Sequence, residues 1–274
     1  MNEKDRSVPI DAEFLAEMDG AFIGWGDPAQ RLRKALAGDE LQLYLQPIAK
    51  LEERRFVMAE VLVRLREEET KLLPPGEFLP VFEQYGMMPA LDRWVVSRLV
   101  QRMARGSLRG FRQFSVNVAS ATLQDFSFPG HVAQILRQFG VPAEALCFEI
   151  DEVDVLGRLN AAVRFGTAVR ALGCRLAIDG FGRRAATFAP LKTLRVDFIK
   201  VDGSITRRLL SANTALNKLR AIVRVAQTIR VGVIAEFVEE AEVLARLIGL
   251  GVEYAQGFGI ARPAPIDDLL ATAK

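Results

Sequence analysis

The feature that most constrains the fold is an alternation of short apolar runs with amphipathic segments along most of the chain. The strand-like runs lie at 41–49, 57–65, 111–119, 145–151, 175–181, 196–202, 231–238 and 253–261. Between them, apolar residues recur every three or four positions, as they do in helices that cover a sheet. Strands that are apolar on both faces and alternate with helices indicate a largely parallel sheet. Eight such units predict an α/β fold, a closed TIM-like (β/α)8 barrel. The alternative is an open doubly wound sheet, but no glycine-rich phosphate loop follows the first run.

The length of 274 residues suits one large domain, because single barrels run to about 250 residues. We divide the chain into an N-terminal extension (1–28), the barrel (29–268) and a short tail (269–274). Asp27 and Pro28 have the residue types of a helix cap and a first helical turn, so a helix is expected to begin there.

Charge and cysteine content limit the partners and the compartment. The net charge of +2 produces no strong field that would attract DNA or a membrane surface. Cys147 and Cys174 lie in apolar runs and are expected to be buried thiols of a reducing compartment. No apolar stretch approaches the roughly 20 residues of a membrane span, and the first residues lack a signal-peptide core. We therefore expect a cytoplasmic protein.

His131 is the single histidine, and its place in a helical segment predicts a position near a helix N-terminus at the surface. Catalytic triads that depend on histidine and zinc sites rich in histidine or cysteine are therefore nearly excluded. Any hydrolytic chemistry must use carboxylates, amides and lysine.

Polar residues occur in seven of the apolar runs, where an uncompensated charge would be costly. They are Glu60, Asn117, Glu149, Asp179, Lys200, Glu236 and Gln256. Each of them alone could be an ordinary salt-bridged barrel residue, but seven on successive strands favour a shared site. Barrel enzymes place their chemistry at the carboxyl ends of the strands. Three carboxylates and an amide oxygen form a set of hard ligands that suits Mg²⁺ or Mn²⁺.

Longer stretches carry a resemblance to a known family. They are LYLQPI, AEVLVRL, FSVNVAS, FEIDE, AIDGFG, DFIKVD, AEFVEE and AQGFGIARP, spread over about 30–268. In these stretches and in their spacing the chain resembles the EAL domain family, which comprises cyclic di-GMP phosphodiesterases and their non-catalytic relatives. The resemblance implies a barrel of the EAL type, with AEVLVRL standing in place of the signature E-A-L.

The resemblance also implies roles for the polar residues. Glu60, Asn117, Glu149 and Asp179 match ligands of a first metal ion, Mg²⁺ or Mn²⁺, and Glu236 matches a carboxylate that serves a second. Catalysis would then use Glu60, Glu236 and Lys200, with the lysine helping to position the attacking water. Two metal ions about 3.5–4 Å apart suit the in-line hydrolysis of a phosphodiester.

Further residues match groups that bind the dinucleotide or support the site. The ligand-binding set is Gln46, Leu62, Arg64, Asp92, Phe237 and Gln256, and the loop anchors are Glu152 and Glu239. Arg64 is expected to meet a phosphate, whereas Gln46 and Asp92 could also be plain hydrogen-bonding residues.

Three departures from the family pattern bear on activity. The family has two adjacent aspartates where this chain has Asp179 and Gly180, so a second metal ion would lose one carboxylate. The following loop, which the family uses to couple the metal site to dimer formation, reads RRAATF at 183–188. Its two arginines are either a solvated turn or a source of charge near the altered metal site. Phe237 replaces a glycine, and its ring is expected to stack on guanine, to pack in the core, or to plug the pocket.

Three functions therefore remain open. The first is a degenerate EAL domain that binds cyclic di-GMP as a receptor or signalling module, passing the signal to a protein partner or a homodimer. The second is a slow but working phosphodiesterase that releases linear pGpG, and the third is a scaffold that binds no nucleotide. Gly180→Asp is expected to raise turnover at least about tenfold if this position is the main defect.

Overall fold

The computed structural model describes residues 25–38, 40–66, 71–106, 110–184 and 187–271, so most of the predicted N-terminal extension and the end of the tail lie outside it. The strands are β1 (Leu41–Lys50), β2 (Arg55–Arg66), β3 (Leu72–Leu73), β4 (Gln113–Asn117), β5 (Leu146–Asp151), β6 (Arg175–Phe181), β7 (Phe198–Val201), β8 (Gly232–Ala235), β9 (Tyr254–Ala255) and β10 (Ala264–Pro265). The α-helices are α2 (Pro28–Ala37), α3 (Pro75–Gln84), α4 (Met88–Ala104), α5 (Phe128–Phe139), α6 (Glu152–Gly157), α7 (Leu159–Ala171), α8 (Gly203–Arg207), α9 (Asn213–Ile229), α10 (Ala241–Gly249) and α11 (Asp268–Ala271). Short 3₁₀ turns occupy Thr122–Gln124, Ala143–Ala145 and Ala189–Lys192.

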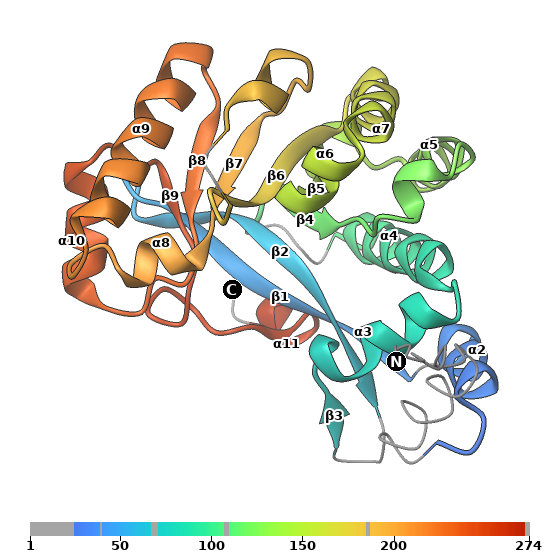
Figure 1. Cartoon of the computed structure of the whole chain (residues 1–274). Helices are drawn as coiled ribbons and strands as arrows, with labels where there is room; N and C mark the ends of the chain where they lie inside the picture. The colour runs from blue at the N-terminus through green and yellow to red at the C-terminus, as the bar shows by residue number, and fades with distance from the viewer. Residues whose placement is uncertain (1–24, 39, 67–70, 107–109, 185–186, 272–274) are drawn as a thin grey trace, which may run out of the picture.

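The strands close into the predicted barrel. The strand order is β1-β9-β8-β7-β6-β5-β4-β2, and β2 pairs back with β1 to complete the ring, while β3 and β10 extend its edges. Neighbouring strands from β2 round to β9 are parallel. Figure 1 shows α4, α5, α7, α9 and α10 outside the strands. The sequence prediction of a TIM-like barrel is confirmed.

The first strand differs from a regular (β/α)8 barrel. β1 runs antiparallel to both of its barrel neighbours, β2 and β9. Only the four residues 51–54 separate β1 from β2, and they form a tight turn. A parallel crossover needs a dozen or more residues, so this connection can make only an antiparallel hairpin.

The last predicted run, 253–261, forms a strand only at β9 (Tyr254–Ala255). Beyond it the chain turns against the segment after β8. The amide of Val238 donates to the carbonyl of Gln256, and a Cβ on Gly257 would lie 2.2 Å from the Val238 backbone nitrogen. Only glycine permits this approach of two backbones.

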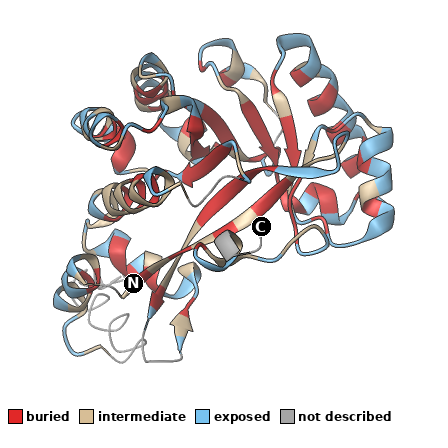
Figure 2. Cartoon of the chain, turned by 180° about the vertical axis from the view of Figure 1, so that it is seen from behind, coloured by how far each residue is buried: buried red, intermediate tan, exposed pale blue. Residues whose placement is uncertain are grey.

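The helices bury one face against the barrel, as their apolar spacing predicts. Asp27 caps α2 by accepting a hydrogen bond from the amide of Gln30 at 2.9 Å, which confirms the predicted helix start. Figure 2 shows buried residues along the strands and on the inner helix faces, with exposed residues on the outer faces. No helix among the described residues is long and apolar enough to cross a membrane.

The barrel interior has an apolar floor that is separate from the main core between strands and helices. Its members come from six barrel strands, and Tyr254 of a seventh strand, β9, packs against them. They are Ile48, Val57, Met58, Cys147, Ala177, Phe198 and Ile234. Phe198 and Tyr254 meet edge to face, with ring centroids 5.7 Å apart. A cluster shared by strands all round the ring can lie only inside it. This floor leaves the carboxyl ends of the parallel strands for polar side chains.

Candidate functional site

Strand periodicity places the predicted site residues directly above the apolar floor. Side chains two positions apart on a strand point to the same face of the sheet. Each of the following polar residues lies two positions from a member of the floor or from Tyr254: Gln46, Glu60, Glu149, Asp179, Lys200, Glu236 and Gln256. Seven strands therefore direct polar groups to the same rim of the barrel.

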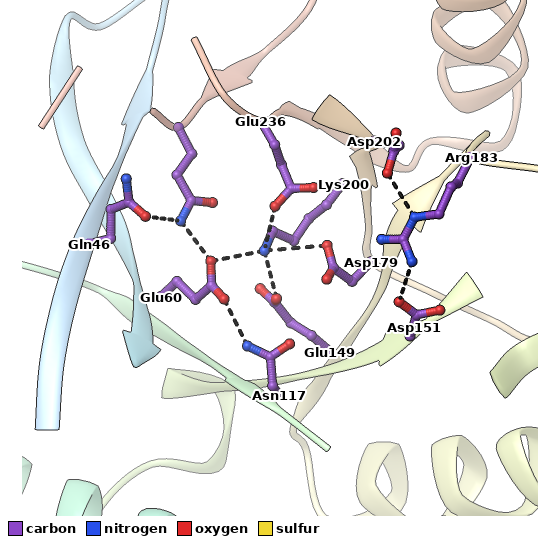
Figure 3. Close-up of polar contacts among 11 residues, drawn as sticks. Gln46, Glu60, Asn117, Glu149, Asp151, Asp179, Arg183, Lys200, Asp202 and Glu236 are labelled. Carbon is purple, nitrogen blue, oxygen red and sulfur yellow. Dashed lines mark hydrogen bonds and ion pairs between the residues drawn. The ribbon is translucent and has the colours of Figure 1, made fainter. Parts of the chain in front are cut away.

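Lys200 lies at the centre of this rim. Its Nζ is 2.7 Å from Oε2 of Glu149, 3.0 Å from Oε2 of Glu60, 3.1 Å from Oε1 of Glu236 and 3.5 Å from Oδ1 of Asp179. The lysine side chain is only 1% exposed. Figure 3 shows the four carboxylates arranged around the ammonium group. We call these five residues the carboxylate cage.

Amide side chains extend the cage toward β1 and β4. Asn117 donates through Nδ2 to Oε1 of Glu60 at 2.7 Å, and Gln256 donates through Nε2 to Oε2 of Glu60 at 2.6 Å. Gln256 also donates to Oε1 of Gln46 at 3.1 Å, and Gln46 donates to the carbonyl of Ala261 at 3.2 Å. The structure thus joins eight of the predicted site residues in one connected group.

Burial and mutual repulsion shift the pKa values of the cage. Burial raises the pKa of Glu149 to about 8, and it raises the pKa of Glu236 well above its usual range. Burial alone would lower the pKa of Lys200, but the surrounding carboxylates outweigh it and raise that pKa. The cage therefore combines a lysine of raised pKa with two carboxyl groups, Glu149 and Glu236, whose pKa values are also raised, as expected when several acidic groups share one buried place.

The oxygen atoms of the cage are of the chemical type that binds one divalent cation. In their present arrangement, however, they do not form a metal site. Oε1 of Glu149 and Oδ1 of Asp179 are buried acceptors that receive no hydrogen bond. Yet no three acidic, histidine or cysteine side chains among the described residues converge as they stand on a metal position. The reason is visible in the contacts: the carboxylates surround the Lys200 ammonium, and Asn117 presents its nitrogen to Glu60. Binding of a cation would require the Asn117 amide to turn its oxygen inward.

Glu152 holds the turn that follows β6. Its carboxylate is buried and accepts from the amide of Gly182 at 2.9 Å and from the amide of Arg184 at 3.2 Å. The contact matches the loop-anchoring role that the resemblance implies. Glu239, the other predicted anchor, has an exposed side chain.

Phe237 directly follows the cage residue Glu236 and lies at the surface. Its side chain is 48% exposed, so the expectation that the ring packs in the core is wrong. The ring covers Gly203, where a Cβ would lie 2.2 Å from a ring carbon, and the Arg207 guanidinium lies 4.4 Å from the ring centroid. Phe237 also has φ +54, a left-handed conformation that a bulky residue rarely adopts. Glycine adopts this left-handed conformation without steric cost, so it is more favourable than phenylalanine for the backbone at position 237.

The contacts of the remaining ligand-binding candidates are with residues outside the cage. Asp92 is buried, and its Oδ2 accepts from the amide of Ala119 at 3.0 Å and from the Thr122 hydroxyl at 2.6 Å. These contacts fit the plain hydrogen-bonding reading of Asp92. Arg64 lies over the ring of Tyr44 at 5.2 Å from its centroid, and Leu62 is half-buried opposite Tyr44 in the β1–β2 hairpin.

Two acidic residues of the rim were missed in the sequence analysis. Asp151 caps α6, Asp202 caps α8, and both also bind the Arg183 guanidinium. The Arg183 side chain is 46% exposed, as expected of a solvated turn, but two carboxylates bind its guanidinium. The signal for the two aspartates was present, because Asp151 lies two positions beyond Glu149 on β5 and Asp202 lies two positions beyond Lys200, directly after β7.

The cage at the rim of a barrel with an antiparallel first strand can now be compared with known proteins. The sequence matches the family model described as "EAL domain" over residues 29–263. This chain belongs to the EAL domain family. Its EAL barrel is similar to the cyclic di-GMP phosphodiesterase PdeF of Escherichia coli (strain K12), with 32% identity over 241 residues. That alignment covers 88% of this chain and 32% of PdeF, and the chain spans about a third of the length of the curated relatives it matches.

Solved EAL structures share the same architecture. The FimX EAL domain from Pseudomonas aeruginosa, bound to c-di-GMP, is 31% identical, with a TM-score of 0.81 over 87% of this chain and 97% of that one. The FimX EAL domain of Xanthomonas citri in complex with c-diGMP is 28% identical, with a TM-score of 0.81 over 87% and 93%.

Proposed function

We propose that this EAL domain binds cyclic di-GMP at the rim of its barrel as a signalling module, and that it hydrolyses the dinucleotide weakly or not at all. The observation that carries the proposal is the connected group at the rim, which joins eight predicted site residues while Gly180 provides no carboxylate. Two FimX EAL domains with c-di-GMP bound support the choice of ligand.

The donor types of the cage suit one divalent cation, Mg²⁺ or Mn²⁺. Glu60, Glu149 and Asp179 would provide carboxylate oxygens, and Asn117 would provide its amide oxygen after turning. Such an ion polarises a phosphate oxygen and lowers the pKa of bound water. Because burial raises the pKa of Glu149 to about 8, cation binding at this carboxylate is expected to release protons.

The chain's own residues supply position and charge. Lys200 holds an ammonium group among the cage carboxylates, and it is the candidate to help position the attacking water. Arg64 lies four residues beyond Glu60 on β2 and is the candidate to meet the phosphodiester. The half-exposed ring of Phe237 is the candidate to stack on a guanine, an interaction worth about 1–3 kcal/mol per base.

An active phosphodiesterase is the second candidate function. It is favoured by Lys200 and Glu236, which are both present and in contact at 3.1 Å. It is disfavoured by Gly180, because removal of one group that stabilises developing charge typically costs about 10²–10³ in rate. A scaffold that binds no nucleotide is disfavoured, because the connected polar residues at the rim would then have no ligand to bind.

The test combines affinity and turnover on the same protein. Calorimetric titration of cyclic di-GMP with Ca²⁺ present is expected to give saturable heat that weakens in EDTA. Incubation with Mg²⁺ or Mn²⁺, followed by chromatography, is expected to give pGpG at least about 10²-fold more slowly than PdeF does. Absence of binding would leave only the scaffold, and turnover equal to that of PdeF would establish the enzyme instead.

A matched pair of arginine variants makes the binding test specific to the rim. Arg64→Ala is expected to weaken cyclic di-GMP binding by about tenfold or more, because a charged hydrogen bond contributes about 1.5–3 kcal/mol. Arg224→Ala removes an arginine that is exposed on the outer helix α9 and is expected to leave affinity unchanged. Equal affinities for the two variants would place the nucleotide elsewhere.

The proposal also covers the compartment and the partners of this domain. Cys147 and Cys174 are both free and buried, which suits a reducing, cytoplasmic compartment. A signalling module also needs a partner that receives the signal, so we propose that this domain acts on another protein or on a second copy of the chain. Size-exclusion chromatography with and without cyclic di-GMP tests the second copy.

A further inference from the structure

The turn after β6 contains a side chain whose placement the proposed function does not explain. Arg183 folds back over Gly180, where a Cβ would lie 2.4 Å from Nη2 and 2.9 Å from Cζ of the arginine. Gly180 has φ +64, and the pairing of β6 with β7 shifts register between Ile178 and Phe181. The guanidinium therefore occupies the volume that a side chain at position 180 would need.

The same guanidinium bridges the two strands on either side of β6. Nε of Arg183 donates to Oδ2 of Asp202 at 2.9 Å, and Nη1 donates to Oδ2 of Asp151 at 3.0 Å. Asp151 ends β5 and Asp202 directly follows β7, which are the neighbours of β6 in the barrel. Figure 3 shows this bridge beside the carboxylate cage, next to Asp179. A single positive charge thus ties two carboxylates across the glycine.

The arginine is fixed at both ends of its side chain. The backbone amides on either side of it, those of Gly182 and Arg184, both donate to Glu152. At the other end, Asp202 accepts from the amide of Ser204 at 3.0 Å and is thereby held at the start of α8. The Arg183 side chain is 46% exposed, but these contacts at both ends tie its guanidinium to the rim.

We propose that Arg183 is a built-in cation of the rim, which occupies the place beside Asp179 over Gly180 and restricts the site to one divalent metal ion. The residues at that place do not fit a second metal ion: Gly180 offers no side-chain oxygen, and Asp151 already binds the guanidinium. A second ion would also meet a like charge. The inference rests on the cation site of the proposed function and deepens it by setting its stoichiometry.

This arrangement changes what a single substitution at position 180 can achieve. Gly180→Asp introduces a side chain in a left-handed backbone conformation, and the Arg183 guanidinium must move aside to admit it. The displaced guanidinium can still pair with the new carboxylate, so the variant is not expected to create a metal site by itself. The tenfold gain in turnover was expected only if position 180 is the main defect, and on this proposal Arg183 is a second one. Removal of the arginine must accompany the new carboxylate.

The test counts metal ions and uses no nucleotide. The full chain is titrated with Mn²⁺, bound and free ions are separated by dialysis, and the bound Mn²⁺ is examined by electron paramagnetic resonance. The unaltered chain and Gly180→Asp are expected to bind one Mn²⁺ with an uncoupled spectrum. The double variant Gly180→Asp/Arg183→Ala is expected to bind two, with the broadened spectrum of neighbouring ions.

The matched control is Gly180→Asp/Arg184→Ala, which removes the adjacent exposed arginine and is expected to behave as Gly180→Asp alone. Two Mn²⁺ in the unaltered chain would overturn the inference and leave the proposed function in place, a result that needs no variant to fold. One Mn²⁺ in a double variant that circular dichroism shows to be folded would also overturn it. No bound Mn²⁺ in any of these proteins would end both the inference and the proposed cation site.

Discussion

Replacement of Lys200 tests whether the carboxylate cage depends on its central ammonium group. Lys200→Met keeps the length of the side chain and removes the charge that lies within 3.5 Å of four carboxylates. Removal of one partner from a buried ion pair typically costs about 3–5 kcal/mol, because the other charge is left uncompensated. Since whole domains are stable by only about 5–15 kcal/mol, this loss should be large.

The assay is urea denaturation followed by circular dichroism in EDTA, and its repetition with Mg²⁺. We expect the free energy of unfolding to fall by about 3–5 kcal/mol in EDTA. Mg²⁺ should restore more stability to the variant than to the unaltered chain, because a cation that binds only the folded state stabilises it and here also replaces the lost charge. Lys34→Met is the control, since that side chain is 75% exposed and should matter by no more than about 0.5 kcal/mol. A loss below about 1 kcal/mol for Lys200→Met would refute the ammonium-centred cage.

Two further predictions concern the residues that support the rim. Burial raises the pKa of Asp92 from 3.8 to about 6, so the folded state holds a proton more tightly than the unfolded state and stability should fall as the pH rises from about 4 to 6. Asp92→Asn keeps an acceptor oxygen and removes the charge. The free energy of unfolding of this variant should therefore exceed that of the unaltered chain by an amount that grows across that window to about 3 kcal/mol. A difference that is constant with pH in urea denaturation would contradict this. Glu152→Gln leaves one of the amides of Gly182 and Arg184 without an acceptor, and hydrogen exchange at that amide should rise about tenfold or more. Exchange that matches the control Glu242→Gln, an exposed residue of α10, would mean that Glu152 does not hold the turn.

Much of the barrel could be predicted because its determinants are local. Apolar runs alternate with helical spacing, and the predicted run at 175–181 coincides with β6. The direction of β1 could also have been read from the sequence, since four residues after Lys50 are too few for a crossover. The length of β9 could not, because that strand ends where Gly257 meets the backbone of Val238, a contact between segments far apart in the chain.

For the site, the sequence by itself determined which chemical groups are available. Glu60, Glu149, Asp179 and Lys200 lie two positions beyond apolar residues on their strands, so their common direction follows from strand periodicity. Only the tertiary structure decided which of these groups pair. Whether Lys200 centres the carboxylates, and whether Arg183 lies over Gly180 or in solvent, depends on distances between strands and turns. The physical reason is that electrostatic interactions change steeply with separation and burial, and neither quantity is encoded at any single position of the chain.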